Sequence, residues 1–380
     1  MRYLIIVAGN AAWCRAAAAR LLSDHDNILC IADGGCPHAA RTLAAGQARQ
    51  LLGQEFQSII YDAHSGFDAD AFAAVCGTLC ANGYLLLLTP PLRQWPEFED
   101  PDYRRICSWP LTSQEIKGRF LQRLSRMLQD HPAARIISPQ QAQEVVPLAT
   151  PAAFTGSGSV DQQRAIAGII RTATGHRRRP LVIEADRGRG KSAALGQAAA
   201  ALLGRPSGSC RHILVTAPSL HAVETLFEHA GKALAGFHAS TGKLEHGDLW
   251  LRFIAPDHLP GEGQDADLLL VDEAAAIPAP LLETLLRRHA RIVFATTVHG
   301  YEGTGRGFAT RFRDTLDRLT PQWRELRLST PIRWGDNDPL ERLSFDALLM
   351  DAEPAADHAF AGFNLGQLEI ERISQDALLQ

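Results

Sequence analysis

The sequence lacks long hydrophobic runs, paired cysteine motifs and a large excess of either charge. No stretch of about 18 uninterrupted apolar residues occurs, so a transmembrane helix is not expected. The opening run, MRYLIIVAGN, is too short in apolar residues for a secretory signal peptide. The seven cysteines are odd in number and include no C-x-x-C pair, which predicts reduced thiols and no zinc site. These absences favour a cytoplasmic protein.

Charge is unevenly distributed along the 380 residues, although the formal net charge is only −4. Residues 151–334 hold 23 Lys and Arg against 18 Asp and Glu, or +5, whereas residues 336–380 hold 2 against 10, or −8. The middle of the chain could therefore line a groove for nucleic acid, and its end is strongly acidic. The length allows about two or three domains with sizeable cores.

Short apolar runs alternate with helical patterns at the start of the chain, which is typical of a parallel α/β sheet. We therefore predict an N-terminal α/β domain over residues 1–135. Its expected strands are Tyr3–Val7, Ile28–Ala32, Ser58–Tyr61 and Tyr84–Thr89, and its expected helices are Ala11–Leu22, Ala69–Cys80 and Ile116–Leu128.

A stretch rich in Pro, Ala, Gly and Ser follows and predicts a linker over residues 136–159. A second alternation of strands and helices predicts another α/β domain over residues 160–335. Residues 336–380 form the acidic C-terminal segment. The strands expected in the second domain are Leu181–Glu184, His212–Thr216, Asp267–Val271, Ile292–Thr296 and Glu325–Leu328.

Residues 181–192 read LVIEADRGRGKS, an apolar strand that enters a Gly-rich turn. This pattern is typical of the phosphate loop of P-loop NTPases, where backbone N–H groups and a helix N-terminus hold phosphates. Lys191 would reach the β- and γ-phosphates, and the Ser192 hydroxyl would bind Mg²⁺. Ala185 stands where the usual motif has its first Gly, and a small residue suffices there. The residues expected at ATP or GTP are Ala185, Asp186, Arg187, Gly188, Arg189, Gly190, Lys191, Ser192, Ala193 and Ala194.

Two carboxylates follow the apolar run LLLV in LLLVDEAAAIP, residues 268–278. An NTPase needs both: Asp272 would hold Mg²⁺, and Glu273 would act as general base toward the attacking water. Taken alone, the pattern is as typical of a solvated acidic turn. The phosphate loop about 80 residues earlier favours a RecA-like, helicase-like P-loop ATPase domain.

Three further motifs fit a helicase-like ATPase less specifically. Gln162, or Gln163, would read the adenine edge, with a surface Gln on an amphipathic helix as the alternative. The segment Val215–Ser219 resembles one that touches nucleic-acid backbone in such motors, or is an ordinary turn. Thr297 and His299 would sense hydrolysis beside the γ-phosphate.

Two arginines are candidates for phosphate contacts. Arg333 would neutralise transition-state charge as an arginine finger, with a surface ion pair as an equally weighted alternative. Arg306, in the Gly-rich segment HGYEGTGRGF, would face phosphate or RNA. That segment is not an acetyl-CoA loop of the form [QR]-x-x-G-x-[GA], because Gly300 or Glu302 occupies the position that requires Gln or Arg.

Two other patterns are interpreted as having no site chemistry. Asp62-Ala63-His64-Ser65 contains the side chains of a hydrolase triad, but neighbours in sequence point apart. The run Arg177–Arg179 is more typical of a solvated loop than of an RNA clamp.

The quoted motifs ADRGRGKSAALG at 185–196, VDEAAAIP at 271–278, HGYEGTGRGF at 299–308 and PIRW at 331–334 occur together. In combination they resemble the ATPase module of the tRNA(Met) cytidine acetyltransferase (TmcA) family. LLGQEFQSIIYDAHSGFDADAFAAVCGTL, followed by LLLLTPP, resembles the N-terminal domain of that family. The resemblance covers nearly the whole chain.

The resemblance implies a bacterial enzyme that forms N4-acetylcytidine at the wobble position of elongator tRNA(Met), using acetyl-CoA and hydrolysis of ATP (or GTP). The family's acetyltransferase domain and tRNA-binding part would follow residue 380, so the chain is either a fragment of a longer protein or a natural truncation. In either case we expect ATP hydrolysis and tRNA binding without acetyl transfer. The nucleotide contacts that it implies are Gln162, Gly188, Gly190, Lys191, Ser192 and Arg333, with Asp272 and Glu273 around Mg²⁺ and water.

Two alternatives remain open. A truncated paralogue would act as an RNA-binding or regulatory partner with vestigial ATPase activity. A DNA-translocating helicase would normally need a complete second motor domain, and the 46 residues after Trp334 are too few for one.

Overall fold

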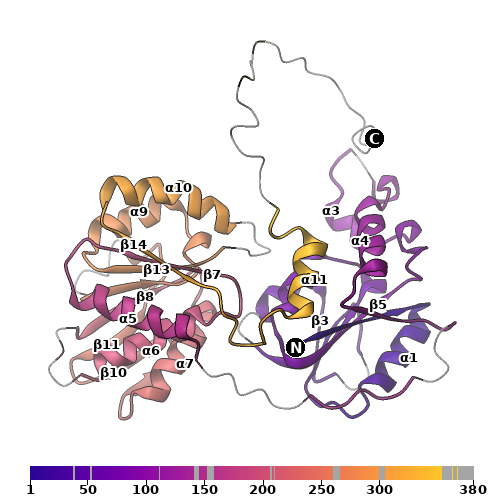
Figure 1. Ribbon diagram of the computed structural model, residues 1–380, viewed down its shortest axis with the longest axis horizontal. Helices are drawn as coiled ribbons and strands as arrows, with labels where there is room; N and C mark the ends of the chain where they lie inside the picture. The colour runs from indigo at the N-terminus through magenta and orange to yellow at the C-terminus, as the bar shows by residue number, and fades with distance from the viewer. Residues whose placement is uncertain are drawn as a thin grey trace. The chain divides into compact units, whose positions relative to one another are not determined.

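The computed structural model describes most of the chain (Figure 1). The described residues are 1–36, 39–51, 54–110, 112–140, 145–151, 158–205, 208, 210–259, 266–298, 304–352, 362 and 366, without the side chains of 49 and 304–311. Residues Met1–Met350 form one compact unit. No helix in these ranges is long and apolar enough to cross a membrane.

A six-stranded sheet in the order β3-β2-β4-β5-β1-β6 forms the first part of the chain, and its neighbouring strands are all parallel. Apolar side chains cover both faces, as expected for parallel strands connected by helices. Its elements are β1 (Tyr3–Ala8), α1 (Ala11–Leu21), β2 (Ile28–Ile31), β3 (Arg41–Leu43), β4 (Phe56–Asp62), α2 (Ala69–Cys76), β5 (Leu79–Thr89), α3 (Tyr103–Ile106), α4 (Arg119–Asp130) and β6 (Ala134–Ile137).

Two of the helices expected from the sequence have different ends in the structure. The helix predicted to reach Cys80 ends at Cys76, and β5 begins at Leu79. This strand pairs with both β4 and β1, so sheet hydrogen bonds override the local helical pattern of residues 77–80. Helix α4 begins at Arg119 rather than Ile116, after Gly118 in the left-handed region (φ 58°).

An eight-stranded sheet in the order β14-β7-β13-β12-β8-β11-β10-β9 forms the second part. The strands from β14 to β11 are parallel, while β9, β10 and β11 form an antiparallel extension that the sequence did not predict. The strands of this sheet are β7 (Leu181–Ala185), β8 (His212–Thr216), β9 (His238–Ser240), β10 (Lys243–His246), β11 (Leu249–Phe253), β12 (Leu268–Val271), β13 (Ile292–Thr297) and β14 (Arg324–Leu328).

Helices cover both faces of the second sheet, as Figure 1 shows. Among the described residues, three helices lie on one face and two on the other, and each face has its own apolar core. The first group is α5 (Val160–Thr174), α6 (Lys191–Leu203) and α7 (Glu224–Ala233), and the second is α9 (Ala279–Arg288) and α10 (Thr304–Leu319). The predicted fold class, a parallel α/β domain followed by a second α/β domain whose glycine-rich turn joins a parallel strand to a helix, is confirmed.

The last helix, α11 (Pro339–Leu348), follows the second sheet in sequence but packs into the core of the first. Leu340, Leu343 and Ala347 are each 0% exposed within that core. Just before α11, Asp338 accepts hydrogen bonds from the backbone N–H and the guanidinium of Arg2, at 2.7 and 3.0 Å. The acidic segment therefore begins with an apolar helix face and a buried ion pair that the sequence pattern did not predict.

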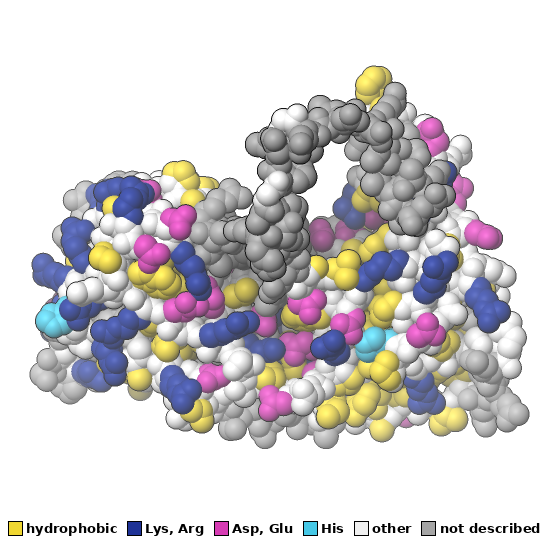
Figure 2. All heavy atoms as spheres, turned by 45° about the horizontal axis from the view of Figure 1, so that its top comes forward, with side chains coloured by type: hydrophobic (Ala, Val, Ile, Leu, Met, Phe, Trp, Pro, Cys, Tyr) yellow, Lys and Arg dark blue, Asp and Glu magenta, His cyan; other side chains and the backbone are white. Residues whose placement is uncertain are grey.

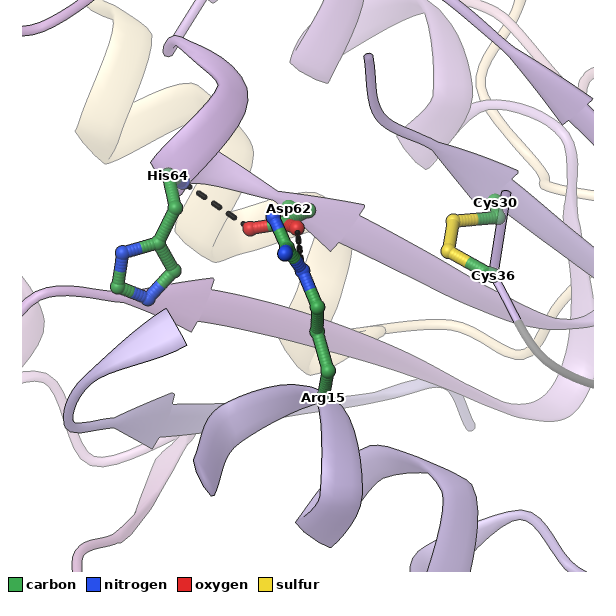
Figure 3. The surroundings of a disulfide bond; sticks show 5 residues. All are labelled: Arg15, Cys30, Cys36, Asp62 and His64. Carbon is green, nitrogen blue, oxygen red and sulfur yellow. Dashed lines mark hydrogen bonds and ion pairs between the residues drawn. A yellow bond between two sulfur atoms is a disulfide. The ribbon is translucent and has the colours of Figure 1, made fainter. Parts of the chain in front are cut away.

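One expectation about cysteine is wrong in the structure. Cys30 and Cys36 form a disulfide at the end of β2, with Cα atoms 6.3 Å apart (Figure 3), where seven reduced thiols were expected. Their sequence spacing has no C-x-x-C pattern, so the sequence carried no signal for the pair. The five remaining cysteines are not part of a disulfide.

We predict that Leu343→Ala destabilises the protein by about 2–4 kcal/mol, because it leaves a cavity in the first core. Arg342→Ala, on the same helix with a side chain 73% exposed, should change the free energy of unfolding by less than about 0.5 kcal/mol. Urea unfolding followed by circular dichroism measures both. Equal effects of the two substitutions would mean that α11 does not belong to this core.

Candidate nucleotide site

The phosphate loop, residues 185–192, joins the end of β7 to the start of α6. Gly188 and Gly190 have φ angles of 73° and 80°, in the left-handed region that residues with a Cβ rarely adopt. Gly190 is the N-cap residue of α6 and has no side chain that could cap the first turn. The turn therefore offers backbone N–H groups and the positive end of a 13-residue helix to an anion.

Both glycines also lie too close to neighbouring side chains for any larger residue. A Cβ at Gly188 would lie 2.6 Å from Cη2 of Trp334, and one at Gly190 would lie 2.5 Å from Cδ1 of Ile332. The backbone N–H of Ile332 donates to the carbonyl of Gly188 at 2.8 Å. The shape of the loop thus depends on the segment 329–338, which we call the Arg333 loop.

Lys191 lies at the centre of the site and is only 6% exposed. Its Nζ donates to Oγ1 of Thr297, at the end of β13, over 2.8 Å. Oγ1 of Thr297 in turn donates to Oε2 of Glu273, after β12, over 2.9 Å. The Nζ of Lys191 is 3.8 Å from Oε1 of Glu273. The carboxyl ends of three adjacent parallel strands therefore bring a cation, a hydroxyl and a carboxylate together.

Glu273 has an unusual backbone conformation and a perturbed acidity. Its φ is 45°, which is uncommon for a residue with a side chain and typical of functional positions. Burial acts to raise its pKa, but the charges of Lys191 and Arg187 and the hydrogen bond from Thr297 hold the pKa below its ordinary value. Glu273 is therefore an ionised carboxylate at neutral pH.

Asp272 is fully buried, with 0% exposure. Its Oδ1 accepts from the backbone N–H of Glu273 at 3.0 Å, whereas its Oδ2 has no hydrogen-bond partner among the described residues. Burial and the neighbouring charge of Glu273 raise its pKa to about 6, against the opposing effects of Ser192 and Lys191. A buried carboxylate oxygen without a partner is a costly arrangement that a cation would relieve.

The residues around Asp272 fit Mg²⁺ better than a metal held by protein ligands alone. No cluster of three or more His, Cys, Asp or Glu side chains in the described ranges could hold a metal ion. Mg²⁺ commonly takes one or two protein oxygens and completes its coordination with water and substrate phosphates. The hydroxyl of Ser192 and the carboxylate of Asp272 provide such a pair beside the phosphate loop.

The phosphate loop borders a cavity of about 760 Å³. Of the residues expected at the nucleotide, it is lined by Arg187, Gly188, Arg189, Gly190, Lys191, Ser192, Ala193, Glu273 and Arg333. Ala185 and Ala194 are buried, at 1% and 0% exposure, and they and Asp186 do not line it. Ala185 belongs to β7, where its carbonyl accepts from Val298, so it does not open the turn. His299 and the side chain of Arg306 lie outside the described residues.

Two polar residues expected at the nucleotide form contacts within the protein instead. Gln162 is only 3% exposed, and its Nε2 donates to the carbonyl of Gly190 at 3.3 Å, so it supports the phosphate loop. Arg189 donates to Oε1 of Glu341, in α11, at 2.7 Å. Gln163, the alternative to Gln162, is exposed. None of these contacts places a side chain at an adenine edge.

Arg333 lies at the cavity, as an arginine finger would, but it is engaged in an ion pair. Its Nε is 3.3 Å from Oε1 of Glu55, and its Nη1 donates to the carbonyl of Gly77 at 3.5 Å. The structure therefore agrees in part with both alternatives for Arg333. Its side chain lines the cavity, as a phosphate contact requires, and it also forms an ion pair with Glu55. Glu55 carries no motif, and only the tertiary structure reveals its position.

The two remaining polar patterns of the sequence, the segment after β8 and residues 62–65, add no catalytic group to the site. Ser219, in the segment after β8, lines the cavity. Asp62 accepts from Nε of Arg15 at 2.8 Å and from the backbone N–H of His64 at 3.1 Å, while the imidazole points away from the carboxylate (Figure 3). This geometry excludes a triad in which the imidazole of His64 contacts Asp62.

The described residues on the face drawn in Figure 2 do not form a single basic groove. On the face drawn in Figure 2, Lys and Arg side chains are interleaved with Asp and Glu over the described residues. Positive side chains are therefore dispersed over the described part of this face rather than gathered in one stripe.

Two family models match the chain. Residues 1–139 match "tRNA(Met) cytidine acetyltransferase TmcA, N-terminal", and residues 182–351 match "RNA cytidine acetyltransferase NAT10/TcmA, helicase domain". Among solved structures, the HK97 bacteriophage large terminase covers 58% of this chain and 52% of its own length, at 14% identity. Its TM-score of 0.36 is too low to support an argument.

Curated relatives resemble the chain over most or all of its length. The tRNA(Met) cytidine acetyltransferase TmcA of Nitrosococcus halophilus is 46% identical over 392 residues, covering 100% of this chain and 52% of the relative. The TmcA of Vibrio cholerae is 40% identical over 309 residues, covering 81% and 40%. The chain thus spans about half the length of the curated relatives it matches. It belongs to the tRNA(Met) cytidine acetyltransferase TmcA family, whose N-terminal and helicase domains it matches.

Proposed function

We propose that this chain binds and hydrolyses ATP (or GTP) with Mg²⁺ at the phosphate loop, as the energy-coupling module of a tRNA(Met) cytidine acetyltransferase. The observation that carries the proposal is the buried network of Lys191, Thr297 and Glu273 beside the glycines of the loop. Such a network positions a cation for phosphate and an ionised carboxylate for water in one cavity.

In the proposed reaction, the phosphate loop and Lys191 hold the β- and γ-phosphates. The first-turn N–H groups of α6 and the Lys191 ammonium stabilise charge on the transferring phosphoryl group. Phosphate oxygens would take over the hydrogen bond that Lys191 now donates to Thr297. Lys191 is nearly buried, so water screens this attraction little.

Glu273 is the proposed general base. It would accept a proton from the water that attacks the γ-phosphorus, while the bond between that phosphorus and the ADP oxygen breaks. Its lowered pKa keeps it ionised and therefore able to accept the proton. Thr297 orients this carboxylate through its hydrogen bond. When phosphate leaves, the change in this hydrogen bond would be transmitted to β13, which ends at Thr297.

Ser192 and Asp272 are the proposed protein ligands for Mg²⁺, directly or through water. When bound, this ion neutralises charge on the β- and γ-phosphate oxygens. Arg333 would compensate charge in the transition state once a phosphate replaces Glu55 as its partner.

The family relationship extends the proposal to elongator tRNA(Met) as partner, acetyl-CoA as acetyl donor and the cytoplasm as location, with N4-acetylcytidine formed at the wobble position. Acetyl transfer itself is assigned to the part of the relatives that this chain does not span.

We predict that Lys191→Ala and Glu273→Gln each reduce ATP turnover at least about 100-fold, because one removes phosphate stabilisation and the other the base. Lys243→Ala and Glu283→Gln, at ion pairs whose residues do not line the cavity, serve as matched controls and should retain turnover. Phosphate release assays measure the rates, and thermal unfolding checks the fold. Retained turnover in either site variant would contradict the mechanism.

We predict that the wild-type chain hydrolyses ATP at a rate that tRNA increases. Steady-state phosphate release, measured with and without tRNA, separates this proposal from an RNA-binding partner with vestigial ATPase activity. An RNA-binding partner with vestigial activity would bind tRNA in a filter-binding assay, but its ATP turnover would not exceed that of the Lys191→Ala variant.

We predict that Asp272→Asn stabilises the protein more at neutral than at acid pH. The folded pKa of about 6 exceeds the ordinary 3.8, so ionising Asp272 costs stability. That cost is absent below the ordinary pKa, grows as pH rises toward about 6 and stays constant above it. Urea unfolding of both proteins at several pH values measures the difference in free energy. The same variant should lose the thermal stabilisation that Mg²⁺ and ATP give together to the wild type.

A further inference from the structure

The cavity at the phosphate loop has a second wall that comes from the first sheet. Glu55, immediately before β4, Thr78, between α2 and β5, and Cys80, in β5, all line it. The sequence motifs assign no chemistry to these three residues, and the nucleotide mechanism proposed above does not use them. A helicase-like motor normally closes its nucleotide site with a second motor domain, and here residues of the first sheet line that cavity instead.

Glu55 connects this wall to Arg333. Its Oε1 is 3.3 Å from Nε of Arg333, and its Oε2 accepts from the Cys80 thiol at 3.9 Å. Burial and the charge of Glu55 raise the pKa of Cys80 to about 11, so Cys80 remains a neutral donor. The guanidinium of Arg333 also donates to the carbonyl of Gly77, next to Thr78.

The backbone around Arg333 is held on both sides. Before it, the carboxylate of Asp161 accepts hydrogen bonds from the backbone and hydroxyl groups of Ser329 and Thr330, at 3.0–3.2 Å. After it, Trp334 packs on Gly188 and α11 is anchored in the first core. Arg333 can therefore exchange partners by rotation of its side chain, without moving the loop.

The ion pair is weak enough to exchange. The side chains of Arg333 and Glu55 are 28% and 55% exposed, so solvent screens their attraction. A nucleotide triphosphate carries several negative charges, accepts bidentate hydrogen bonds from a guanidinium and would lie in the same cavity. Phosphate would therefore outcompete a single half-exposed carboxylate.

We propose that Glu55 is a positioning residue that holds Arg333 at the wall of the empty cavity and releases it to the phosphates of a bound nucleotide. This proposal rests on the proposed ATPase function. It adds that a residue next to the first sheet controls the position of Arg333 at the nucleotide site. Part of the nucleotide's binding energy is then spent in breaking the pair between Glu55 and Arg333. Removing the carboxylate should tighten nucleotide binding without changing the chemical step.

The test measures nucleotide affinity by fluorescence titration with a mant-labelled, non-hydrolysable ATP analogue and Mg²⁺, using the full chain. Glu55→Gln should lower the Kd about threefold, with kcat for ATP changed less than about twofold. Arg333→Ala should weaken binding. In the Arg333→Ala background, Glu55→Gln should have no further effect on Kd, because the residue through which it acts is absent.

Glu228→Gln provides the matched control for charge. Glu228 lines the same cavity, is exposed and pairs with Lys232 rather than with Arg333. If Glu228→Gln tightens binding as much as Glu55→Gln, or if Glu55→Gln acts equally without Arg333, general repulsion of phosphate explains the result and the proposal is overturned. An unchanged Kd in Glu55→Gln overturns it as well. A wild-type chain that binds no nucleotide would instead overturn the proposed function on which it rests.

Discussion

The site depends on one constraint: Lys191 is a cation held almost entirely out of water. A buried ammonium is stable only beside compensating oxygens, and the structure supplies Oγ1 of Thr297 at 2.8 Å and Glu273 at 3.8 Å. This compensation brings a second carboxylate, Asp272, next to the first, and their proximity contributes to the pKa of about 6 at Asp272. The opposing shifts of the two carboxylates suit them to different tasks, one as ionised base and one as cation ligand.

The phosphate loop is not an independent element, because its shape is shared with the Arg333 loop and α11. Trp334 occupies the space that a side chain at Gly188 would need, and Arg189 pairs with Glu341 at 2.7 Å. Trp334 also lies under the guanidinium of Arg2, whose carbon is 3.4 Å from the ring centroid. A continuous set of packed and charged contacts therefore runs from the nucleotide cavity to the first strand of the chain.

Much of the second sheet could be predicted because its strands are short apolar runs that end in polar residues. The expected strands there differ from β7, β8, β12, β13 and β14 by at most one residue at either end. The antiparallel extension β9 to β11 was missed, since its half-exposed strands, KLEH and LWLRF, have no continuous apolar run. Helix α2 was predicted too long, because residues 77–80 fit a helical pattern. Leu79 and Cys80 belong to β5 instead, a strand that forms through pairing with β4 and β1.

The sequence by itself determined the chemistry of the site: the glycines and Lys191 of the phosphate loop, the carboxylates after β12 and the family. These are local patterns, in which backbone geometry and residue type are linked over a few positions. Only the tertiary structure decided the partners. Gln162 supports the loop from outside the cavity, Arg189 lines the cavity but is paired with Glu341, and Arg333 is paired with Glu55, some 280 residues away along the chain. Long side chains can reach several partners, so burial and packing, rather than sequence spacing, select among them.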